Sequence, residues 1–306
     1  MILCLIAYGC QKNDVDPTDV DPKQVAPVAK APADTTIKLP VSALTVKGSG
    51  TDASGTIVGY LWSQVSGPAE ATITNESSAS TSIAGFIAGK YVFQFTVIDN
   101  NGLSGLTTFS VTVIAPQITT LTLSPANNPS EVALAVLGSA DWTNTTSIEE
   151  PLAAWTDGGT PFYVRDLLKF DLSSIPTNST ILTANLYLYS DTIPKNGDLV
   201  HANSGIDNSV LIQQVASSWT TATVNWFNQP QGLTANQVVV PGTTLPFLNI
   251  NVDVKNMVGS MVSTNANYGF KLALQSEVIY TSRIFCSSFY TDASRHPKLV
   301  VTYIKN

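Results

Sequence analysis

Apolar and polar residues alternate in short runs along the first third of the chain. These runs cover residues 60–65, 91–98 and 109–113, and the segment Asp-Asn-Asn-Gly at 99–102 separates the last two. An alternation with a period of two is typical of a β-strand with one buried face. An Asn-Gly pair signals a hairpin turn. Residues 36–115 are therefore predicted to form a small all-β sandwich, with Trp62 in its core.

A second set of strands follows Pro116, and it is predicted to extend from 118 to 306. Residues 165–172, 183–189 and 298–303 favour strands, whereas the stretch from Pro125 to about residue 160 is expected to be rich in loops. One apolar stripe has the period of an α-helix instead, and its members are Val254, Met257, Val258, Met261 and Val262. The prediction is a helix of two to three turns, with Asp253 as its N-cap and its end at residues 267–269.

The N-terminal residues predict export and lipidation. Residues 1–10 (MILCLIAYGC) are a short apolar run that ends at Cys10, too short to span a bilayer. They are interpreted as the remnant of a lipoprotein signal with Cys10 lipidated; the alternative is the apolar start of a cytosolic protein. Residues 11–35 are acidic and rich in proline, which predicts an extended tether. They resemble the surface-export signals of Bacteroidetes lipoproteins, which implies attachment to the outer membrane with the protein facing outward.

The charge of the chain excludes one class of partner. The formal net charge is −7, and charged residues make up 12% of the sequence. A nucleic-acid-binding protein needs a basic surface that displaces counterions from phosphate, and a charge balance of this kind does not supply one. No nucleic-acid partner is therefore expected, and contact with a membrane is expected only through the lipid anchor.

The sequence contains no recognisable catalytic constellation. It has two histidines, His201 and His296, and contains no Gly-x-Ser-x-Gly motif whose serine a histidine could activate. Neither CxxC nor HExxH spacing occurs. The adjacent pair Glu149-Glu150 does not converge in the way that a glycosidase pair must. No enzymatic activity, cofactor or metal site is expected.

Three segments of the first module resemble a known family. They are residues 48–52 (GSGTD), residues 57–68 (IVGYLWSQVSGP) and residues 95–102 (FTVIDNNG). Together they resemble a polycystic-kidney-disease (PKD) domain over about residues 28–115. The resemblance implies an immunoglobulin-like fold that acts as a spacer or an interaction surface outside the cell.

Four ordered blocks of the second module resemble another family. They are residues 165–176, residues 218–230, residues 252–254 with 267–270, and residues 282–283 with 295–303. They resemble the DNRLRE (disaggregatase-related) domain, which overlaps carbohydrate-binding module family 96. The resemblance covers about residues 119–306 and implies a jelly-roll β-sandwich of secreted polysaccharide-degrading and surface proteins, with alginate binding in some relatives. Lys255 and Ile284 depart from the family pattern, which affects the ligand more than the fold.

Arginine is scarce, and every arginine lies in the second module. Arg165, Arg283 and Arg295 all fall within the family blocks. A guanidinium group binds carboxylates through paired hydrogen bonds, as a uronic-acid sugar would require. The alternative is that these side chains bond loop carbonyls or nearby carboxylates. The module holds 9 basic and 13 acidic residues, which argues against a broad polyanion-binding surface.

Trp226 is the second candidate for ligand contact. An aromatic face stacks on a sugar ring, and flanking amides such as Asn225 and Asn228 match its hydroxyls. Trp219 is expected in a strand and in the core, and the alternative for Trp226 is also a place in the core. Trp142 and Trp155 are candidates for an exposed platform, with packing of their loop against the sandwich as the alternative. The full set of candidate ligand-binding residues is Arg165, Lys169, Asn225, Trp226, Asn228, Arg283 and Arg295.

These patterns together predict a non-catalytic surface protein that binds carbohydrate. The expected ligand is a polysaccharide, with uronic-acid polymers as one class, and the expected partners include other surface proteins of a glycan-uptake system. The alternative is a structural or adhesive protein whose modules act as spacers or protein-interaction domains.

Overall fold

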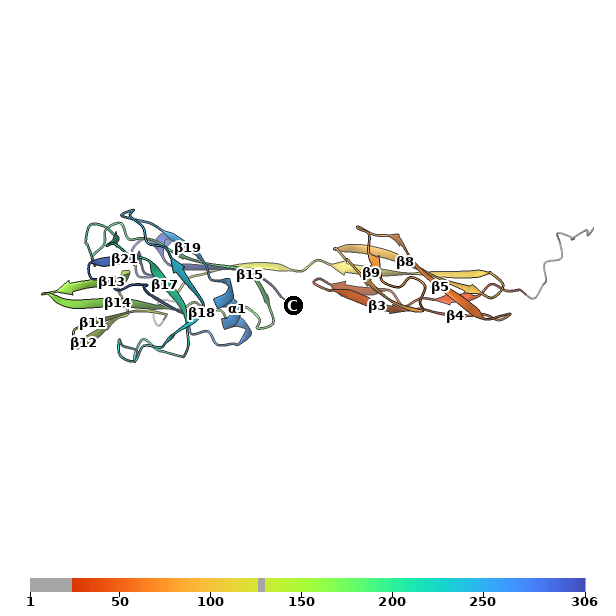
Figure 1. Cartoon of the computed structure of the whole chain (residues 1–306), viewed down its shortest axis with the longest axis horizontal. Helices are drawn as coiled ribbons and strands as arrows, with labels where there is room; N and C mark the ends of the chain where they lie inside the picture. Colours follow the sequence, from red (N-terminus) through yellow and green to blue (C-terminus); the bar gives the residue numbers. More distant parts are fainter. Residues whose placement is uncertain (1–23, 126–129, 306) are drawn as a thin grey trace, which may run out of the picture. The chain divides into compact units, whose positions relative to one another are not determined.

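The structure, a computed structural model, describes residues 24–125 and 130–305 (Figure 1). The chain divides into two compact units, of which the first ends at Pro116 and the second begins at Gln117. Both units are built of β-strands, and the described residues contain a single α-helix. The predicted fold class, an immunoglobulin-like module followed by a β-sandwich with one short helix, is confirmed. Cys10 and most of the predicted tether lie outside the described residues.

The described part of the first unit, residues 24–116, has nine strands in three small sheets. One sheet has the order β2-β9-β8-β5, another β3-β7-β6, and β1 pairs with β4. The strands are β1 (Val28–Lys30), β2 (Thr35–Lys38), β3 (Ala43–Lys47), β4 (Ser49–Thr51), β5 (Ile57–Ser66), β6 (Thr72–Ile73), β7 (Ser80–Ala84), β8 (Gly89–Asp99) and β9 (Ser104–Ile114).

Aromatic side chains fill the core of the first unit, as the alternating pattern predicts. The residues at 91, 93, 95 and 97 of β8 are fully buried. Trp62 of β5 is also fully buried, its ring lies 4.2 Å from that of Phe95, and its Nε1 donates to the Ser78 carbonyl at 2.7 Å. The indole therefore packs inside the unit and pairs its one polar atom, as a buried Trp requires.

The predicted tether is wrong at its C-terminal end. Residues 28–30 form β1 and pair with β4, and Thr35 begins β2, which runs parallel to β9. Between these strands the carboxylate of Asp34 accepts a hydrogen bond from the Ser110 backbone N–H at 2.7 Å. Low apolar content made this segment look unfolded, but its backbone hydrogen bonds hold it to the sheet.

The second unit is a sandwich of two sheets that enclose one main core. The smaller sheet has the order β10-β22-β15-β19; the larger contains the path β16-β21-β13-β14-β20-β17-β18, with β11 paired to β14 and β12 paired to β11. The strands are β10 (Ile118–Leu123), β11 (Glu131–Leu137), β12 (Ala140–Asn144), β13 (Glu149–Asp157), β14 (Thr160–Leu168), β15 (Thr180–Leu188), β16 (Asn203–Ser204), β17 (Val210–Val215), β18 (Gly232–Val240), β19 (Ile250–Asp253), β20 (Phe270–Leu274), β21 (Thr281–Cys286) and β22 (Lys298–Ile304).

The stretch up to residue 160 is not the loop-rich region that the sequence suggests. It holds β11, β12 and β13, which lie beside β14 at one end of the unit (Figure 1). The first six residues of β11 and of β13 are buried, so neither strand alternates in polarity. A strand that is covered on both faces loses the period-two pattern that would identify it. Trp142 and Trp155 therefore lie on strands.

The single α-helix covers Lys255–Ser263, and its apolar stripe is confirmed. Met257, Val258, Met261 and Val262 are buried against the main core. The N-cap is Val254 rather than Asp253, although the Asp253 carboxylate accepts from the Lys255 N–H at 2.8 Å and so still satisfies one free donor of the first turn. The helix ends at Ser263, before the predicted end at 267–269. No helix in residues 24–125 or 130–305 is long and apolar enough to cross a bilayer.

Candidate functional site

Three neighbouring strands of the larger sheet bring a group of polar side chains together. Arg165 lies on β14, Lys271 on β20 and Gln213 on β17, and the register pairs Gln213 with Lys271. Lys271 alternates along β20 with Phe270 and Leu272, which are buried in the main core. Because successive side chains of a strand point to opposite faces, the polar group lies on the face of β20 that is turned away from that core.

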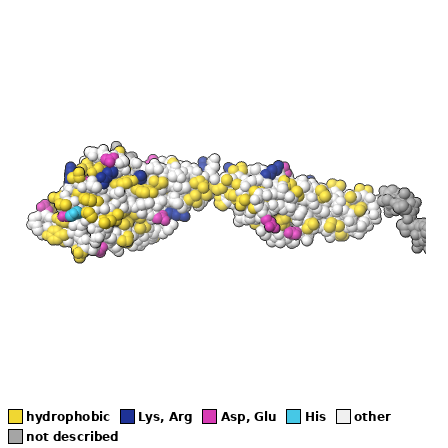
Figure 2. All heavy atoms as spheres, turned by 90° about the horizontal axis from the view of Figure 1, so that it is seen from above, with side chains coloured by type: hydrophobic (Ala, Val, Ile, Leu, Met, Phe, Trp, Pro, Cys, Tyr) yellow, Lys and Arg dark blue, Asp and Glu magenta, His cyan; other side chains and the backbone are white. Residues whose placement is uncertain are grey.

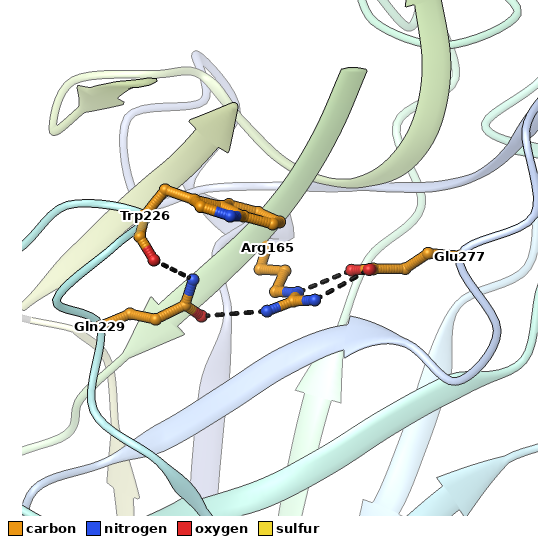
Figure 3. A network of polar contacts seen from close by, with 4 residues as sticks. All are labelled: Arg165, Trp226, Gln229 and Glu277. Atoms are coloured by element: carbon orange, nitrogen blue, oxygen red, sulfur yellow. Dashed lines mark hydrogen bonds and ion pairs between the residues drawn. The ribbon is translucent and has the colours of Figure 1, made fainter. Parts of the chain in front are cut away.

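The guanidinium group of Arg165 is held on three sides (Figure 3). Its Nε donates to Glu277 Oε1 at 2.6 Å and its Nη2 to Glu277 Oε2 at 2.8 Å, while Nη1 reaches Gln229 Oε1 at 3.5 Å. The guanidinium carbon lies 4.3 Å from the centre of the Trp226 ring. A paired bond to a carboxylate and a stacked aromatic ring fix both the position and the plane of the group.

Lys271 adds a second cation beside this arginine. Partial burial, followed by the nearby charge of Arg165, lowers the pKa of Lys271 to about 8, although Glu277 opposes the shift. Within the described residues, the ion pairs are Arg165–Glu277 and His201–Asp198, so the Lys271 ammonium group belongs to neither. It is the cation of this group that remains available to an external anion.

A pocket of about 260 Å³ lies over these side chains, and we call it the Arg165 pocket. Its lining contains both polar and apolar side chains, which suits a ligand with hydroxyl and carboxylate groups on an apolar ring. The lining residues are Arg165, Leu211, Gln213, Lys271, Ala273, Leu274, Gln275 and Glu277.

Trp226 borders the cluster as a half-buried side chain. It packs with Trp219 and Tyr268 against a small apolar cluster around Leu134 and Leu167. Gln229 Nε2 donates to the Trp226 carbonyl at 2.7 Å, which ties the loop to the arginine through one side chain (Figure 3). Trp219 was expected in a strand and in the core; it lies instead in a loop, half-buried, with its Nε1 bonded to the Tyr268 carbonyl at 2.7 Å.

Asn225 and Asn228 hold their own loop together. The side-chain oxygen of Asn225 accepts from the N–H groups of Phe227 and Asn228 at 3.0 and 2.9 Å. The Asn228 side chain accepts from the Asn225 N–H at 2.7 Å and donates to the Thr223 carbonyl at 2.9 Å. These amides shape the turn that carries Trp226.

Arg283 is not a surface residue, which corrects its assignment to a ligand site. It is fully buried, and its Nη1 lies 3.4 Å from the Asn208 carbonyl and 3.5 Å from that of Pro241. Burial lowers the pKa of Arg283 to about 10. A position within a family block can serve the fold or the ligand. The place of Arg283 in such a block therefore did not distinguish a structural role from a binding role.

Arg295 and Lys169 are not among the residues of the Arg165 pocket. Arg295 donates to the Ser190 carbonyl and, at 3.1 Å, to Thr192 Oγ1, so it fastens a loop. Lys169 lines a separate pocket of about 480 Å³ together with Asp171 and residues near the end of α1. Of the seven candidates, Arg165 and Trp226 are brought into contact with each other, and the remaining five are placed elsewhere or used locally.

Sequence reasoning missed Lys271, Glu277 and Gln213. The signal for Lys271 was its place in Phe-Lys-Leu-Ala-Leu, a lone charge in an otherwise apolar strand. Glu277 carried no such signal, because its partner is 112 positions away in the sequence.

Each histidine makes a local contact. His201 Nδ1 lies 2.7 Å from Asp198 on an exposed loop, and His296 Nε2 lies 2.7 Å from the Tyr290 carbonyl. In the part of the chain that the structure describes, no group of three or more His, Cys, Asp or Glu side chains is arranged to hold a metal ion.

Comparison with known proteins matches one family model to each unit. The family model described as "K319L-like, PKD domain" matches residues 31–113, and the model of carbohydrate-binding module family 96 matches residues 138–303. Neither description names an enzyme. The first unit is also 34% identical over 77 residues to the dyslexia-associated protein KIAA0319-like protein of Mus musculus. That match covers 25% of this chain and 7% of the mouse protein.

Several solved structures are similar to the chain. The PKD domain from the KIAA 1837 protein is 32% identical, with a TM-score of 0.27, and the match covers 28% of this chain and 85% of that one. A structure titled for the promiscuous specificity of carbohydrate-binding modules from the β-sandwich superfamily is 14% identical, with a TM-score of 0.24 and 92% of each chain covered. Because the model for residues 138–303 spans more than half of the 306 residues, the chain belongs to carbohydrate-binding module family 96, and the residues that match the PKD model precede that module.

Proposed function

We propose that the second unit binds an acidic polysaccharide, and that a uronic-acid unit docks in the Arg165 pocket. The observation that carries this proposal is Lys271. Its ammonium group is partly buried, belongs to neither ion pair of the described chain, and lies in a pocket with the amide of Gln213 and the apolar side chains of Leu211 and Ala273. A sugar carboxylate that pairs with Lys271 would offset the cost of that burial.

Arg165 has a different part in this proposal. Glu277 already neutralises it, so Arg165 positions Glu277 and supports the Trp226 ring, and Lys271 supplies the charge that meets the ligand. The side chains of Arg165, Glu277 and Lys271 together carry a net charge of +1 when Lys271 is protonated. A single local positive charge is compatible with the acidic character of the whole unit, because the pocket needs to attract only one carboxylate at a time.

The experiment compares Lys271→Ala with Lys255→Ala in gels that contain alginate or polygalacturonate. Lys255 is an exposed lysine at the start of α1 and serves as the matched control. A charged hydrogen bond contributes about 1.5–3 kcal/mol, so Lys271→Ala should weaken binding by about tenfold or more. Lys255→Ala should bind as the wild type does. Equal binding by the two variants would contradict the proposal, and no binding by the wild type would favour a structural or adhesive role.

We propose further that the chain is anchored to the outer bacterial surface through Cys10, with the PKD domain as a spacer. The apolar run that ends at Cys10 and the acidic segment after it support this. Cys10→Ser should move the protein from the membrane fraction to the medium, and a variant that stays with the membrane would contradict the anchor.

A further inference from the structure

Four aromatic side chains form a row across the strands at one end of the second unit. They are Trp142 of β12, Phe162 of β14, Trp155 of β13 and Tyr280, which immediately precedes β21. The hairpin of β13 and β14 places Trp155 directly opposite Phe162. On the other side of β14, Ala135 of β11 is paired with Trp142 of β12 and with Val164 of β14. Paired residues point to the same face of a sheet, so Trp142 shares a face with Val164. Phe162 is two positions from Val164 on β14 and therefore points to that face as well.

The rings of this row make contact in two pairs, and the outer ring of each pair is exposed to solvent. Trp142 stacks on Phe162 with ring centres 5.1 Å apart and planes inclined by 15°, and Trp155 meets Tyr280 edge to face at 5.3 Å. Trp142 is 44% exposed and Tyr280 57% exposed, while the two middle rings are half-buried. Neighbouring strands lie about 4.8 Å apart, so a row across β12, β11, β14, β13 and β21 extends for roughly 19 Å.

Strand geometry holds these rings in place. The turn between β13 and β14 contains Gly158 and Gly159, both with positive φ, the backbone form that a two-residue hairpin requires. A ring mounted on paired strands loses little freedom when a ligand binds, so stacking is achieved at a lower entropic cost than on a mobile loop.

The charges around the row distinguish it from the Arg165 pocket. Residues 138–162 contain no lysine or arginine, and Asp141 and Asp157 flank the turns. Arg165 is an odd number of positions from Phe162 on the same strand, so its side chain points to the opposite face of β14. A uronic acid would be repelled at the row, whereas the C–H face of an uncharged pyranose can stack on an aromatic ring and leave its hydroxyls in water.

We propose that Trp142, Phe162, Trp155 and Tyr280 form a second carbohydrate-binding surface, which stacks the rings of a neutral polysaccharide and lies on the face of β14 opposite the Arg165 pocket. This site does not depend on the acidic-glycan site. A strip of several rings matches an extended chain better than a single sugar, so the ligand is a polymer of uncharged pyranoses.

The test uses the full chain and three variants in gels that contain a neutral β-glucan, xylan or galactomannan. Trp142→Ala and Tyr280→Ala each remove one exposed ring, and Phe227→Ala removes a 65% exposed ring from the Trp226 loop as the matched control. Loss of one stacking contact should weaken binding to the neutral polymer by about tenfold. Phe227→Ala and Lys271→Ala should bind the neutral polymer as the wild type does.

Two results would overturn the proposal. One is a wild-type chain that no neutral polysaccharide retards, and the other is retardation that both ring variants preserve. Sedimentation of the wild type at several concentrations covers the remaining case: self-association lost in Trp142→Ala, without glycan binding, would show that the row is an interface between copies. Binding to alginate is scored separately, so failure at the Arg165 pocket and failure at the aromatic row are distinguishable.

Discussion

At the scale of single residues, Arg283 shows that a buried cation can serve the fold. Its side chain is surrounded by protein, and its Nε and Nη2 atoms have no hydrogen-bond partner among the residues that the structure describes. The ring of Phe285 lies 5.6 Å from its guanidinium carbon. Scarcity of arginine pointed to positions 165, 283 and 295 in the sequence, but scarcity carries no information about burial. Distant loops, those of Asn208 and Pro241, determine that Arg283 is enclosed.

Arg283→Ala should destabilise the second unit without weakening glycan binding. The variant leaves a cavity and removes the donor to two loop carbonyls, so the free energy of unfolding should fall by about 1–3 kcal/mol. Arg283→Met, which keeps most of the volume and removes the buried charge, should lose less. Thermal melts and alginate affinity of both variants check this. Intact stability together with lost affinity would return Arg283 to the binding site.

At the scale of elements, β11, β13 and β14 bring three carboxyl groups together inside the second unit. Glu131, Glu150 and Asp166 are at most 3% exposed. Burial first, and then the neighbouring carboxylates, raise the pKa of Glu150 well above its ordinary value. Burial likewise raises the pKa of Asp166, with Glu131 adding to the effect. Glu131 Oε1 accepts from the N–H and hydroxyl of Ser288 at 2.9 and 2.6 Å.

Stability of the second unit should therefore fall as the pH rises. Glu150 and Asp166 bind protons more tightly in the folded state, so their contribution is complete below the ordinary carboxyl pKa values and is lost as the pH rises toward the raised ones. The melting temperature should be lower at pH 8 than at pH 5. Asp166→Asn should reduce that difference, because an amide does not ionise. A melting temperature that rises between pH 5 and pH 8 would contradict the raised pKa values of Glu150 and Asp166.

Replacing a glycine by alanine should have opposite effects on stability in the β13–β14 turn and in helix α1. Gly159 has φ +84 in the turn between β13 and β14, with open space where a side chain would project, so Gly159→Ala should cost about 1–2 kcal/mol through backbone strain alone. Gly259 lies in α1 with ordinary φ and equally open space. Gly259→Ala should therefore stabilise the unit by about 0.5–1 kcal/mol. Chemical unfolding of both variants measures the two changes in the free energy of unfolding. Two changes of the same sign would contradict the backbone conformations assigned to Gly159 and Gly259.

The elements also show where prediction from sequence succeeded and where it failed. Strand β8 and helix α1 were predictable because each has one buried face, which leaves a period in the sequence. Strands β11 and β13 were not, because burial on both faces removes that period. The Asp157-Gly158-Gly159 turn was the remaining sequence signal for the hairpin of β13 and β14. The Arg165 pocket was half-predictable: Arg165 and Trp226 lie in family blocks, whereas Glu277 and Gln213 reach the pocket through pairing of strands far apart in the sequence.

At the scale of the whole molecule, the two units are expected to fold independently. Each has its own aromatic or aliphatic core, and the chain passes from one to the other at Pro116 and Gln117. The first unit needs residues that composition assigned to the tether, because β1 pairs with β4 and Asp34 bonds Ser110.

Fragments of the chain test this boundary. Residues 24–116 and residues 117–306 should each unfold in one cooperative transition when expressed alone. A fragment of residues 36–116 should be less stable than the fragment of residues 24–116, because it lacks β1 and the Asp34 hydrogen bond. Equal melting temperatures for the fragments 24–116 and 36–116 would show that residues 24–35 do not stabilise the first unit. Insolubility of residues 117–306 alone would indicate a shared core.

The central claim is that the second unit binds an acidic polysaccharide through Lys271, and the most direct test is the affinity of the full chain for alginate as a function of pH. The pKa of Lys271 is about 8, and uronic-acid carboxyl groups stay ionised throughout the range from pH 6 to 10. The account predicts binding at pH 6–7 that weakens as the pH rises through about 8, and Lys271→Arg, which keeps its charge, should bind equally across the range. No binding to alginate at pH 6, or binding whose strength does not change up to pH 10, would contradict it.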